Sequence, residues 1–445
     1  MPLECQREGS FLPDPPARLS ESVGQSHEGC PYRTFAKPEI ALNQDKTKMR
    51  VLQLAPRVCW PLDTGAKLRN YHLARVLSRD ARVTLLAFGN SSSAELRDVY
   101  DEVITVPRGS GYSLGKLLRG AVGRTPLPLL NYMSQEMTDG VARLFTENEF
   151  DVVQVESIHL MNYLRRIRAS SKRALVICDW HNIESELMQR YSEQEKSAPR
   201  RAYGRRTARL MKDFEQRALS EFDAHIAVSE RDAEALRRIN PSAKVFVIEN
   251  GVDSSYYASA GSGSPTRNRI VFVGSMDYHA NVEGAVKFAR QVWPAVHRQK
   301  PGLVFTIVGK DPAPAVRELS SINGVEVTGS VADVRPYYCE AIAAVVPLNV
   351  GGGSRLKISE AMAAGVPVVS TTLGAEGLDI TNGQNILIAD QADELVDTIV
   401  RLTDDERLQN QIASAGKELI AGQYDWSRLG KKLFGCYQQL LAERG

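Results

Sequence analysis

Long apolar runs, an excess of one charge and a secretion signal are all missing from this sequence. No run among its 445 residues approaches the ~18 apolar residues of a membrane-spanning helix. Residues 1–48, rich in proline, serine and glutamate, lack the apolar stretch of a signal peptide, and we expect them to form a disordered tail of a cytoplasmic protein. Because 55 basic residues face 53 acidic ones, the net charge is only +2 and no nucleic-acid partner is expected.

Cysteine is also scarce. The six cysteines show neither CxxC pairs nor the spacing of metal ligands, so we expect reduced thiols and no metal site. Cys178 lies inside an apolar run, where a small buried core residue is the simplest interpretation.

Several enzyme motifs are absent as well. The strand predicted over residues 49–55 continues into Pro56 without a GxGxxG turn, and the strand over 82–88 ends without the acid that would bind a ribose. A nicotinamide-binding fingerprint is therefore missing. The sequence also lacks a Walker GxxxxGK[ST], an HExxH and a GxSxG motif, which removes the commonest phosphoryl-transfer and hydrolase interpretations.

Two series of alternating strands and helices are what the sequence does contain. Near-continuous apolar runs alternate with helical segments from residue 49 to 248, and a second series follows from residue 270. This pattern predicts an α/β fold with parallel sheets covered on both faces, and the length fits two domains. The end of the chain, from Tyr424, is amphipathic at helical spacing and is expected to pack on a surface already built, across both domains.

A glycine-rich turn over residues 351–354 is the strongest candidate site. It follows the apolar run 342–348 and precedes a short helical segment that ends at Gly365, so Ser354 is the expected N-cap. Backbone amides of such a turn and the start of a helix attract anions. Lys357 and Glu360 add a cation and a carboxylate on one face of the helix. A flexible loop with a solvated ion pair is the alternative.

The second half of the chain resembles a known family at several motifs. These are Asn250-Gly251-Val252-Asp253, Phe272-Val273-Gly274, Ile307-Val308-Gly309, and Glu360-Ala361-Met362-Ala363-Ala364-Gly365-Val366-Pro367-Val368-Val369. Together they resemble the retaining glycosyltransferases of family 4. The resemblance implies the GT-B fold, in which two Rossmann-like domains face a cleft and a C-terminal helix crosses back. We therefore expect an acceptor-side domain over residues 49–248 with the helix 424–445, and a nucleotide-sugar donor domain over 249–423.

The resemblance also implies roles for the donor side. Glu360 matches the second acid of the family's E-x7-E motif and is expected to bind the nucleotide ribose, whereas Gly352 stands where the first acid, which contacts the donor sugar, would be. After Gly274 the family's arginine and lysine for the diphosphate are missing. We expect Arg355, Lys357 and the backbone amides of the turn to bind the diphosphate instead. The residues of that turn are Gly351, Gly352, Gly353 and Ser354.

On the other side, Gly65 occupies the place of the family's glycine loop near the diphosphate. His181, which follows the apolar run 174–178, matches the family's active-site histidine; a loop histidine bonded to the backbone is the alternative. The backbone near Val331 is expected to bind the base. Glu156 is the reserve candidate for an acceptor-side base, with a structural role in lining the cleft as the alternative. The nucleotide sugar is a substrate, so no cofactor is expected, and no metal is required by this arrangement.

The expected reaction is transfer of a sugar, with retention, to a saccharide or lipid-linked acceptor in polysaccharide biosynthesis. The alternatives are a GT-B epimerase or phosphorylase, and a nucleotide-sugar binding protein without catalysis. A basic cluster in the charged helical stretch 184–221 is either a solvated face or a surface for peripheral association with the inner face of a membrane. The cluster consists of Arg200, Arg201, Arg205, Arg206 and Arg209.

Overall fold

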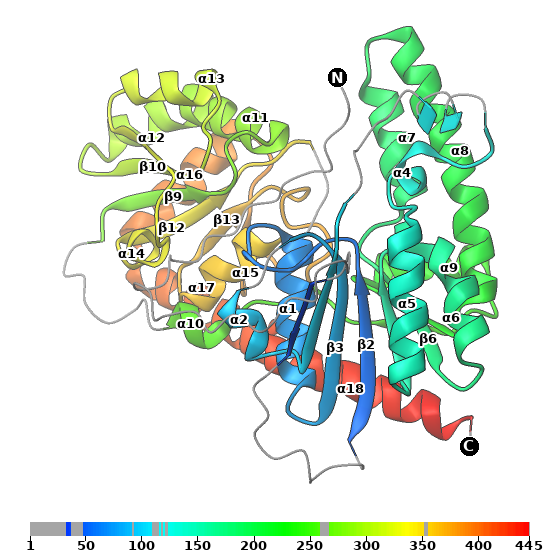
Figure 1. Ribbon diagram of the computed structural model, residues 1–445. Helices are drawn as coiled ribbons and strands as arrows, with labels where there is room; N and C mark the ends of the chain where they lie inside the picture. Colours follow the sequence, from blue (N-terminus) through cyan, green and yellow to red (C-terminus); the bar gives the residue numbers. More distant parts are fainter. Residues whose placement is uncertain are drawn as a thin grey trace.

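The computed structural model describes residues 33–36, 48–90, 93–108, 115–116, 119–120, 123–258, 267–350 and 355–444. Over these ranges the chain forms two α/β domains, each with a central sheet and helices on its faces (Figure 1). The predicted fold class is confirmed. None of the described helices has the length and apolar character needed to span a bilayer.

The N-terminal domain contains an eight-stranded sheet in the order β1-β4-β3-β2-β5-β6-β7-β8. All neighbouring strands are parallel except β1, which is antiparallel to β4. The strands are β1 (Arg33–Ala36), β2 (Met49–Ala55), β3 (Ala81–Phe88), β4 (Glu102–Val106), β5 (Val152–Glu156), β6 (Leu175–Trp180), β7 (Ala224–Ala227) and β8 (Val245–Val247). The order changes direction between β2 and β5, and ligands of such sheets bind beyond the carboxyl ends of the strands.

Helices cover both faces of this sheet. They are α1 (Gly65–Leu77), α2 (Ala94–Arg97), α4 (Leu127–Leu130), α5 (Gln135–Glu147), the 3-10 helix η1 (Ile158–Tyr163), α6 (Leu164–Ser170), α7 (Glu184–Gln194), α8 (Ala198–Glu221) and α9 (Glu230–Ile239). Side-chain caps mark the starts of several of them. Side-chain oxygens of Thr64, Ser134 and Ser229 accept hydrogen bonds from backbone amides in the first turns of α1, α5 and α9.

The C-terminal domain has a six-stranded parallel sheet in the order β11-β10-β9-β12-β13-β14. The strands are β9 (Arg269–Val273), β10 (Val304–Val308), β11 (Val325–Gly329), β12 (Ala341–Val346), β13 (Val368–Ser370) and β14 (Leu387–Ile388). Its helical segments are α10 (Ser254–Ala258), α11 (His279–Lys287), η3 (Phe288–Val292), α12 (Trp293–Gln299), α13 (Pro314–Arg317), η4 (Glu318–Ser321), α14 (Arg335–Cys339), α15 (Leu356–Ala363), α16 (Ala392–Asp404), α17 (Glu406–Leu419) and η5 (Ile420–Tyr424).

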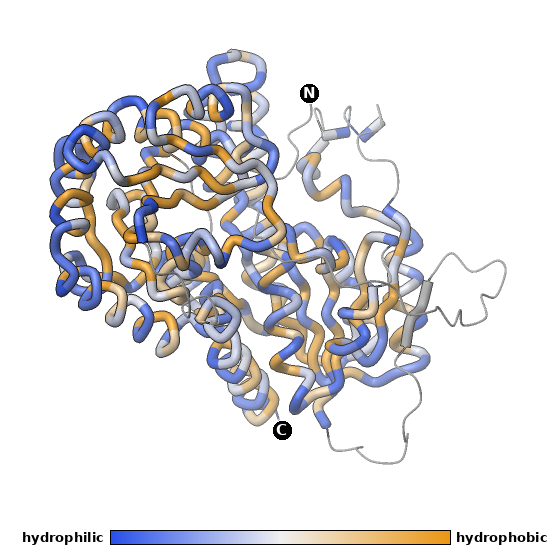
Figure 2. Tube along the Cα trace, turned by 90° about the vertical axis from the view of Figure 1, so that its left-hand side faces the viewer, coloured by the Kyte–Doolittle hydropathy of each residue, from blue (hydrophilic) through white to orange (hydrophobic). Residues whose placement is uncertain are grey.

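Apolar segments run through the interior of both domains, and polar segments lie on the outer turns of the helices (Figure 2). Strands β2, β3 and β12 are buried over almost their whole length, as near-continuous apolar runs predict for parallel sheets, whereas the edge strands β8 and β11 are only partly buried. Two core clusters fill the faces of the N-terminal sheet and one fills the C-terminal domain.

The last helix, α18 (Trp426–Ala442), follows the C-terminal domain but packs on the N-terminal one, where Figure 1 shows it in red beneath the sheet. Its buried side chains are those whose spacing predicted an amphipathic helix: Leu429, Leu433, Tyr437 and Leu440, with Trp426 at the start. Trp426 stacks on His72 of α1, with 5.5 Å between ring centroids. The helix therefore ties the two halves of the chain together.

Two local predictions differ from the structure. The helical stretch expected over residues 184–221 is two helices, because the chain is extended at Glu195 and Ser197 and α8 begins with Pro199 in its first turn. In the expected disordered tail, Arg33–Ala36 forms β1 at the edge of the N-terminal sheet, where pairing with β4 supplies backbone hydrogen bonds. The other residues up to 47 lie outside the described part of the chain.

Candidate active site

A cleft lies between the two domains at the carboxyl ends of their strands. On the N-terminal side it is lined by residues that follow β6, β7 and β8 and by α7 and α9, and on the C-terminal side by α15 and the loop 376–378. The lining comprises His181, Asn182, Ile183, Glu186, Leu187, Arg190, Val228, Ser229, Arg231, Asp232, Glu249, Asn250, Arg355, Leu356, Ser359, Glu376, Gly377, Leu378 and Tyr424. Both walls thus come from positions where open α/β sheets bind ligands.

His181, predicted as an active-site residue, lies in this lining directly after β6. Its Nε2 is 3.1 Å from Oε2 of Glu156, the last residue of β5. A carboxylate at this distance accepts the Nε2 proton, which fixes the orientation of the ring and leaves Nδ1 for another partner. His181 therefore makes a side-chain bond rather than the backbone bond of the alternative interpretation.

Glu156 is fully buried and lies behind His181 instead of in the cleft lining. Its Oε1 accepts hydrogen bonds from the side-chain amides of Gln53 at 2.6 Å and Gln154 at 2.7 Å. The hydroxyl of Tyr437, in α18, donates to the side-chain amide oxygen Oε1 of Gln154. The C-terminal helix thus contacts the polar network that supports His181.

Sequence reasoning missed a buried ion pair beside this network. Arg69 of α1 donates from Nε to Oδ2 of Asp179 at 2.9 Å and from Nη2 to Oδ1 at 3.1 Å, and neither side chain is exposed. It also donates from Nη1 to the carbonyl of Glu249 at 2.9 Å. Burial raises the pKa of Asp179, and Arg69 opposes that shift. One signal was available: Arg69 precedes Leu73 by four residues and so lies on the apolar face of the predicted helix.

Glu156, Asp179 and His181 place one potential ligand atom each within 4.8 Å of one another. Both oxygens of Asp179 are taken up by Arg69, whose guanidinium already supplies the local positive charge. The geometry therefore favours a structural ion pair at this point over a metal centre.

On the opposite wall, helix α15 begins at Leu356 with Arg355 in the N-cap position, one residue later than the expected cap. Ser354 and the three glycines before it lie outside the described residues. Arg355 lines the cleft, and its guanidinium donates to the carbonyls of Leu373 at 2.8 Å and Glu376 at 3.1 Å. These bonds hold its charge at the cleft wall. Gly365, with φ of 73°, ends the helix as predicted.

Glu360 lies one turn further along α15 and is 7% exposed. Burial raises the pKa of its carboxyl to about 7, while a hydrogen bond with Tyr257 and the charge of Lys357 act in the opposite direction. Lys357 is half-buried. Neither residue belongs to the cleft lining, which takes Leu356 and Ser359 from this helix.

The three remaining predicted donor residues lie in different elements: Gly65 begins a helix, and Gly274 and Val331 follow strands. Gly65 is the first residue of α1, whose N-cap is Thr64. At Gly274, after β9, an added Cβ would be 2.8 Å from Nδ2 of Asn281, so close packing explains the glycine there. Val331 follows β11 and is half-buried against the C-terminal core.

Charged residues of α7 and α9 also line the cleft and were not predicted. Arg231 of α9 is 2.5 Å from Glu186 of α7, and Arg190 is 3.7 Å from the same carboxylate oxygen. Glu376, from the C-terminal domain, interacts electrostatically with Arg231. The two walls therefore carry complementary charges at this level of the cleft.

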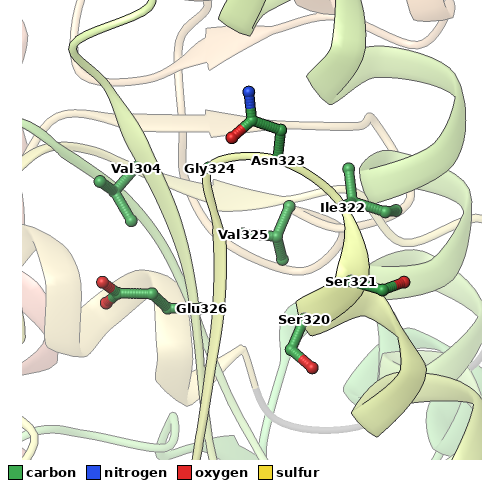
Figure 3. A pocket seen from close by; sticks show the side chains of 8 residues that line it. All are labelled: Val304, Ser320, Ser321, Ile322, Asn323, Gly324, Val325 and Glu326. Atoms are coloured by element: carbon green, nitrogen blue, oxygen red, sulfur yellow. The ribbon is translucent and has the colours of Figure 1, made fainter.

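A second pocket lies at the opposite end of the C-terminal strands. It is formed at the start of β11 by residues 320–326 together with Val304. Figure 3 shows that its side chains do not converge on one point: Asn323 and Ser320 point in opposite directions. Because it lies at the amino ends of the strands and lacks convergent polar groups, we assign it no ligand.

Comparison with protein families identifies both domains. Residues 64–256 match the family model described as Glycosyltransferase Family 4, and residues 267–405 match the model described as Glycosyl transferases group 1. The chain thus carries two glycosyltransferase family domains, one on each side of the cleft.

Curated relatives match only part of the chain. An uncharacterized 44.6 kDa protein in the cps region of Klebsiella pneumoniae is 24% identical over 173 residues, 37% of this chain and 45% of the relative. Glycogen synthase of Mycobacterium tuberculosis is 24% identical over 213 residues, 46% of this chain and 50% of the relative. The matches therefore span about half the length of these relatives.

Solved structures match nearly the whole chain. Sucrose-phosphate synthase from Thermosynechococcus elongatus has a TM-score of 0.64 at 16% identity, covering 89% of this chain and 100% of the other. Anabaena HepE in complex with UDP and glucose has a TM-score of 0.60 at 17% identity, covering 88% and 100%. These likenesses show the GT-B fold.

Proposed function

We propose that this protein is a glycosyltransferase that moves a sugar from a nucleotide-sugar donor to a saccharide or lipid-linked acceptor, with retention of configuration. The observation that carries the proposal is the cleft itself, because two glycosyltransferase family domains meet there. One wall holds His181 on a buried carboxylate, and the other holds the start of α15 with Arg355. We place the reaction in polysaccharide biosynthesis, on the cytoplasmic side of a membrane when the acceptor is lipid-linked.

The donor half of the proposal rests on the start of α15. The donor diphosphate gains negative charge as the bond to the sugar breaks, and fixed positive groups lower the barrier most when they face that charge. Arg355, Lys357 and the positive end of the helix supply such groups, so neither a metal nor a cofactor is required. Glu360, beneath them, accepts hydrogen bonds from the ribose in this proposal.

The acceptor half of the proposal concerns the proton. In a retaining transfer the acceptor hydroxyl forms its bond to the anomeric carbon on the face that the phosphate leaves. The departing phosphate oxygen can accept the hydroxyl proton, so no protein base is needed. Glu156, the reserve candidate, is fully buried behind His181, which fits better with a residue that positions the histidine. His181 then contacts the donor sugar.

The donor base can be found by thermal-shift screening of UDP-, GDP- and ADP-sugars. HepE, a structural neighbour, has been solved with UDP and with UDP-glucose, so uridine nucleotides are the first class to test. A donor at a hundred times its Kd stabilises the folded state by about 2.7 kcal/mol, which raises Tm measurably. Stabilisation by none of these nucleotide sugars would contradict the proposal.

Product analysis then separates the transferase from the alternatives. A transferase releases nucleoside diphosphate and a glycosylated acceptor. An epimerase releases a free or nucleotide-linked sugar of altered configuration without an acceptor, and a binding protein gives no turnover although its Tm rises.

A further inference from the structure

Four basic side chains lie on one face of α8. Arg201, Arg205, Arg209 and Lys212 are spaced by four, four and three residues, which places them on one face of a helix. With a rise of about 1.5 Å per residue they span about 16 Å. We call these four residues the basic stripe.

Neutralising partners are missing along the basic stripe. Within the described part of the chain none of its four side chains makes an ion pair or a hydrogen bond with another residue. Cations four residues apart on a helix repel each other and destabilise it. On α7, by contrast, Arg190 has Glu186 as a partner. An external anionic surface would compensate the repulsion within the stripe.

Arg206, which belongs to the arginine cluster but not to the stripe, has a different role. Arg206 turns away from the stripe and donates from Nη1 to the carbonyl of Gly120 at 2.7 Å and from Nη2 to the carbonyl of Gly123 at 2.5 Å. These bonds hold Gly120 and Gly123 against α8. Arg119 and Arg124 are both exposed there, so they add positive charge beside the helix.

The basic stripe belongs to the same hairpin as one wall of the cleft. Helix α8 packs on α7 at Gly204, where an added Cβ would be only 2.9 Å from Cβ of Ser192. Helix α7 contributes Leu187 and Arg190 to the cleft lining. Figure 1 shows α7 and α8 projecting together from the N-terminal domain. A surface bound to the stripe would therefore lie near the cleft.

We propose that the basic stripe binds the surface of an anionic lipid bilayer. The four charges are spread along one face of a long helix, which suits an extended, negatively charged surface better than a compact ligand. The stripe carries no aromatic side chain on which nucleic-acid bases could stack. Each Lys or Arg near an anionic membrane strengthens binding about fivefold, and salt weakens the attraction.

This inference extends the acceptor half of the proposed function, since a lipid-linked acceptor would be held at the same surface. Vesicle binding can be measured without donor, acceptor or turnover. A protein that does not bind vesicles would therefore leave the transferase proposal intact. Conversely, a protein without transferase activity could still bind vesicles.

The test is co-sedimentation of the full chain with phosphatidylcholine vesicles, with and without about one-third phosphatidylglycerol. The double variant Arg205→Gln/Arg209→Gln removes two charges from the basic stripe. The matched control Arg407→Gln/Lys417→Gln removes two exposed charges from α17, in the other domain. The Tm values of the wild type and the two variants are compared first. Because the substituted side chains are exposed, we expect all three Tm values to be equal.

We expect the wild type to bind the anionic vesicles at low salt and to be released at about 0.5 M salt. Each removed charge should weaken vesicle binding about fivefold, so the stripe variant should bind about 25-fold more weakly than the wild type. The control variant should bind as the wild type does. Equal losses in both variants, equal binding to pure phosphatidylcholine, or no vesicle binding would each overturn the proposal. Tighter binding of the stripe to soluble RNA than to the vesicles would also overturn it in favour of a nucleic-acid partner.

Discussion

At the residue scale, the pKa of Glu360 follows from its burial in α15. Its folded-state pKa is raised to about 7, above the ordinary value of 4.5 for an exposed glutamate. The folded protein therefore binds this proton more tightly than the unfolded chain does. Its contribution to stability is fully present below about pH 4.5 and is lost as pH rises through about 7.

We predict that Glu360→Gln removes this pH dependence. Between pH 5 and 8 the free energy of unfolding of the wild type should fall by roughly 2–3 kcal/mol through this group. Urea unfolding at several pH values measures the effect. Glu215, whose pKa burial also raises to about 7, leaves the variant with a residual slope. Identical pH dependence in variant and wild type would show that Glu360 ionises as freely in the folded state as in the unfolded one.

The same residue has a ligand-binding role in the proposal, and a separate measurement addresses it. Glu360→Ala should weaken binding of the nucleotide sugar that stabilises the wild type most, because the ribose loses its acceptor. Calorimetric titration gives the Kd directly. An unchanged Kd would show that the ribose assignment is wrong, whatever the stability data say.

Lys357→Ala tests the charge on the donor diphosphate. Loss of one preorganised positive group typically lowers turnover by ~10²- to 10³-fold, and the half-buried lysine is no core residue, so the fold should survive. Steady-state kinetics and Tm measure the two effects. The control is Lys417→Ala, which removes an exposed positive charge from α17, away from the cleft. Wild-type turnover in Lys357→Ala would remove this residue from the mechanism.

At the element scale, helix α18 depends on close contact with α1. Gly430 faces α1 so closely that an added Cβ would be 2.4 Å from Cβ of Val76, whereas nothing lies within 4 Å at Gly435 on the same helix. A methyl group has no space at the first position and open space at the second.

Two glycine substitutions in α18 should therefore have opposite effects. Gly435→Ala should stabilise the protein by about 0.5–1 kcal/mol, because alanine is the better helix former. Gly430→Ala should destabilise it by about 1–3 kcal/mol, because α18 must move away from α1. Denaturant unfolding of both variants tests this. If the Gly430→Ala variant had a higher free energy of unfolding than the wild type, α18 and α1 would be able to move apart without loss of stability.

The strands were the most predictable elements. The strand predicted over residues 49–55 has the bounds of β2, and the strand predicted over 82–88 differs from β3 by one residue. The hairpin of α7 and α8 was harder to predict, because charged residues continue across the break and only Pro199 signals a new helix start.

A residue of the candidate site could be predicted only where its position follows from the neighbouring sequence. His181 could be placed at the end of a strand from the sequence alone, and it lies in the cleft. The bond between Arg69 and Asp179 joins residues 110 positions apart, and no local pattern pairs them. The cleft-lining Arg231 meets Glu186 only because α7 and α9 are neighbours in the folded domain.

At the scale of the whole molecule, two domains are joined by helix α18, which follows the C-terminal domain and packs on the N-terminal domain. The core of the N-terminal domain includes Trp426, Leu429 and Leu433 of α18, so this domain is incomplete without the end of the chain. Tyr437 of the same helix contacts the network that supports His181 through Gln154 and Glu156. The arrangement of the cleft thus depends on residues far apart in the sequence.

The central claim is that this cleft cleaves a nucleotide sugar. The most direct test is release of nucleoside diphosphate from UDP-, GDP- and ADP-sugars by the full-length protein, measured with and without a saccharide acceptor. We predict release from at least one donor, faster with a suitable acceptor and about a hundredfold slower in Lys357→Ala. Nucleoside diphosphate release at the background rate for every donor, or equal rates in wild type and Lys357→Ala, would contradict this account.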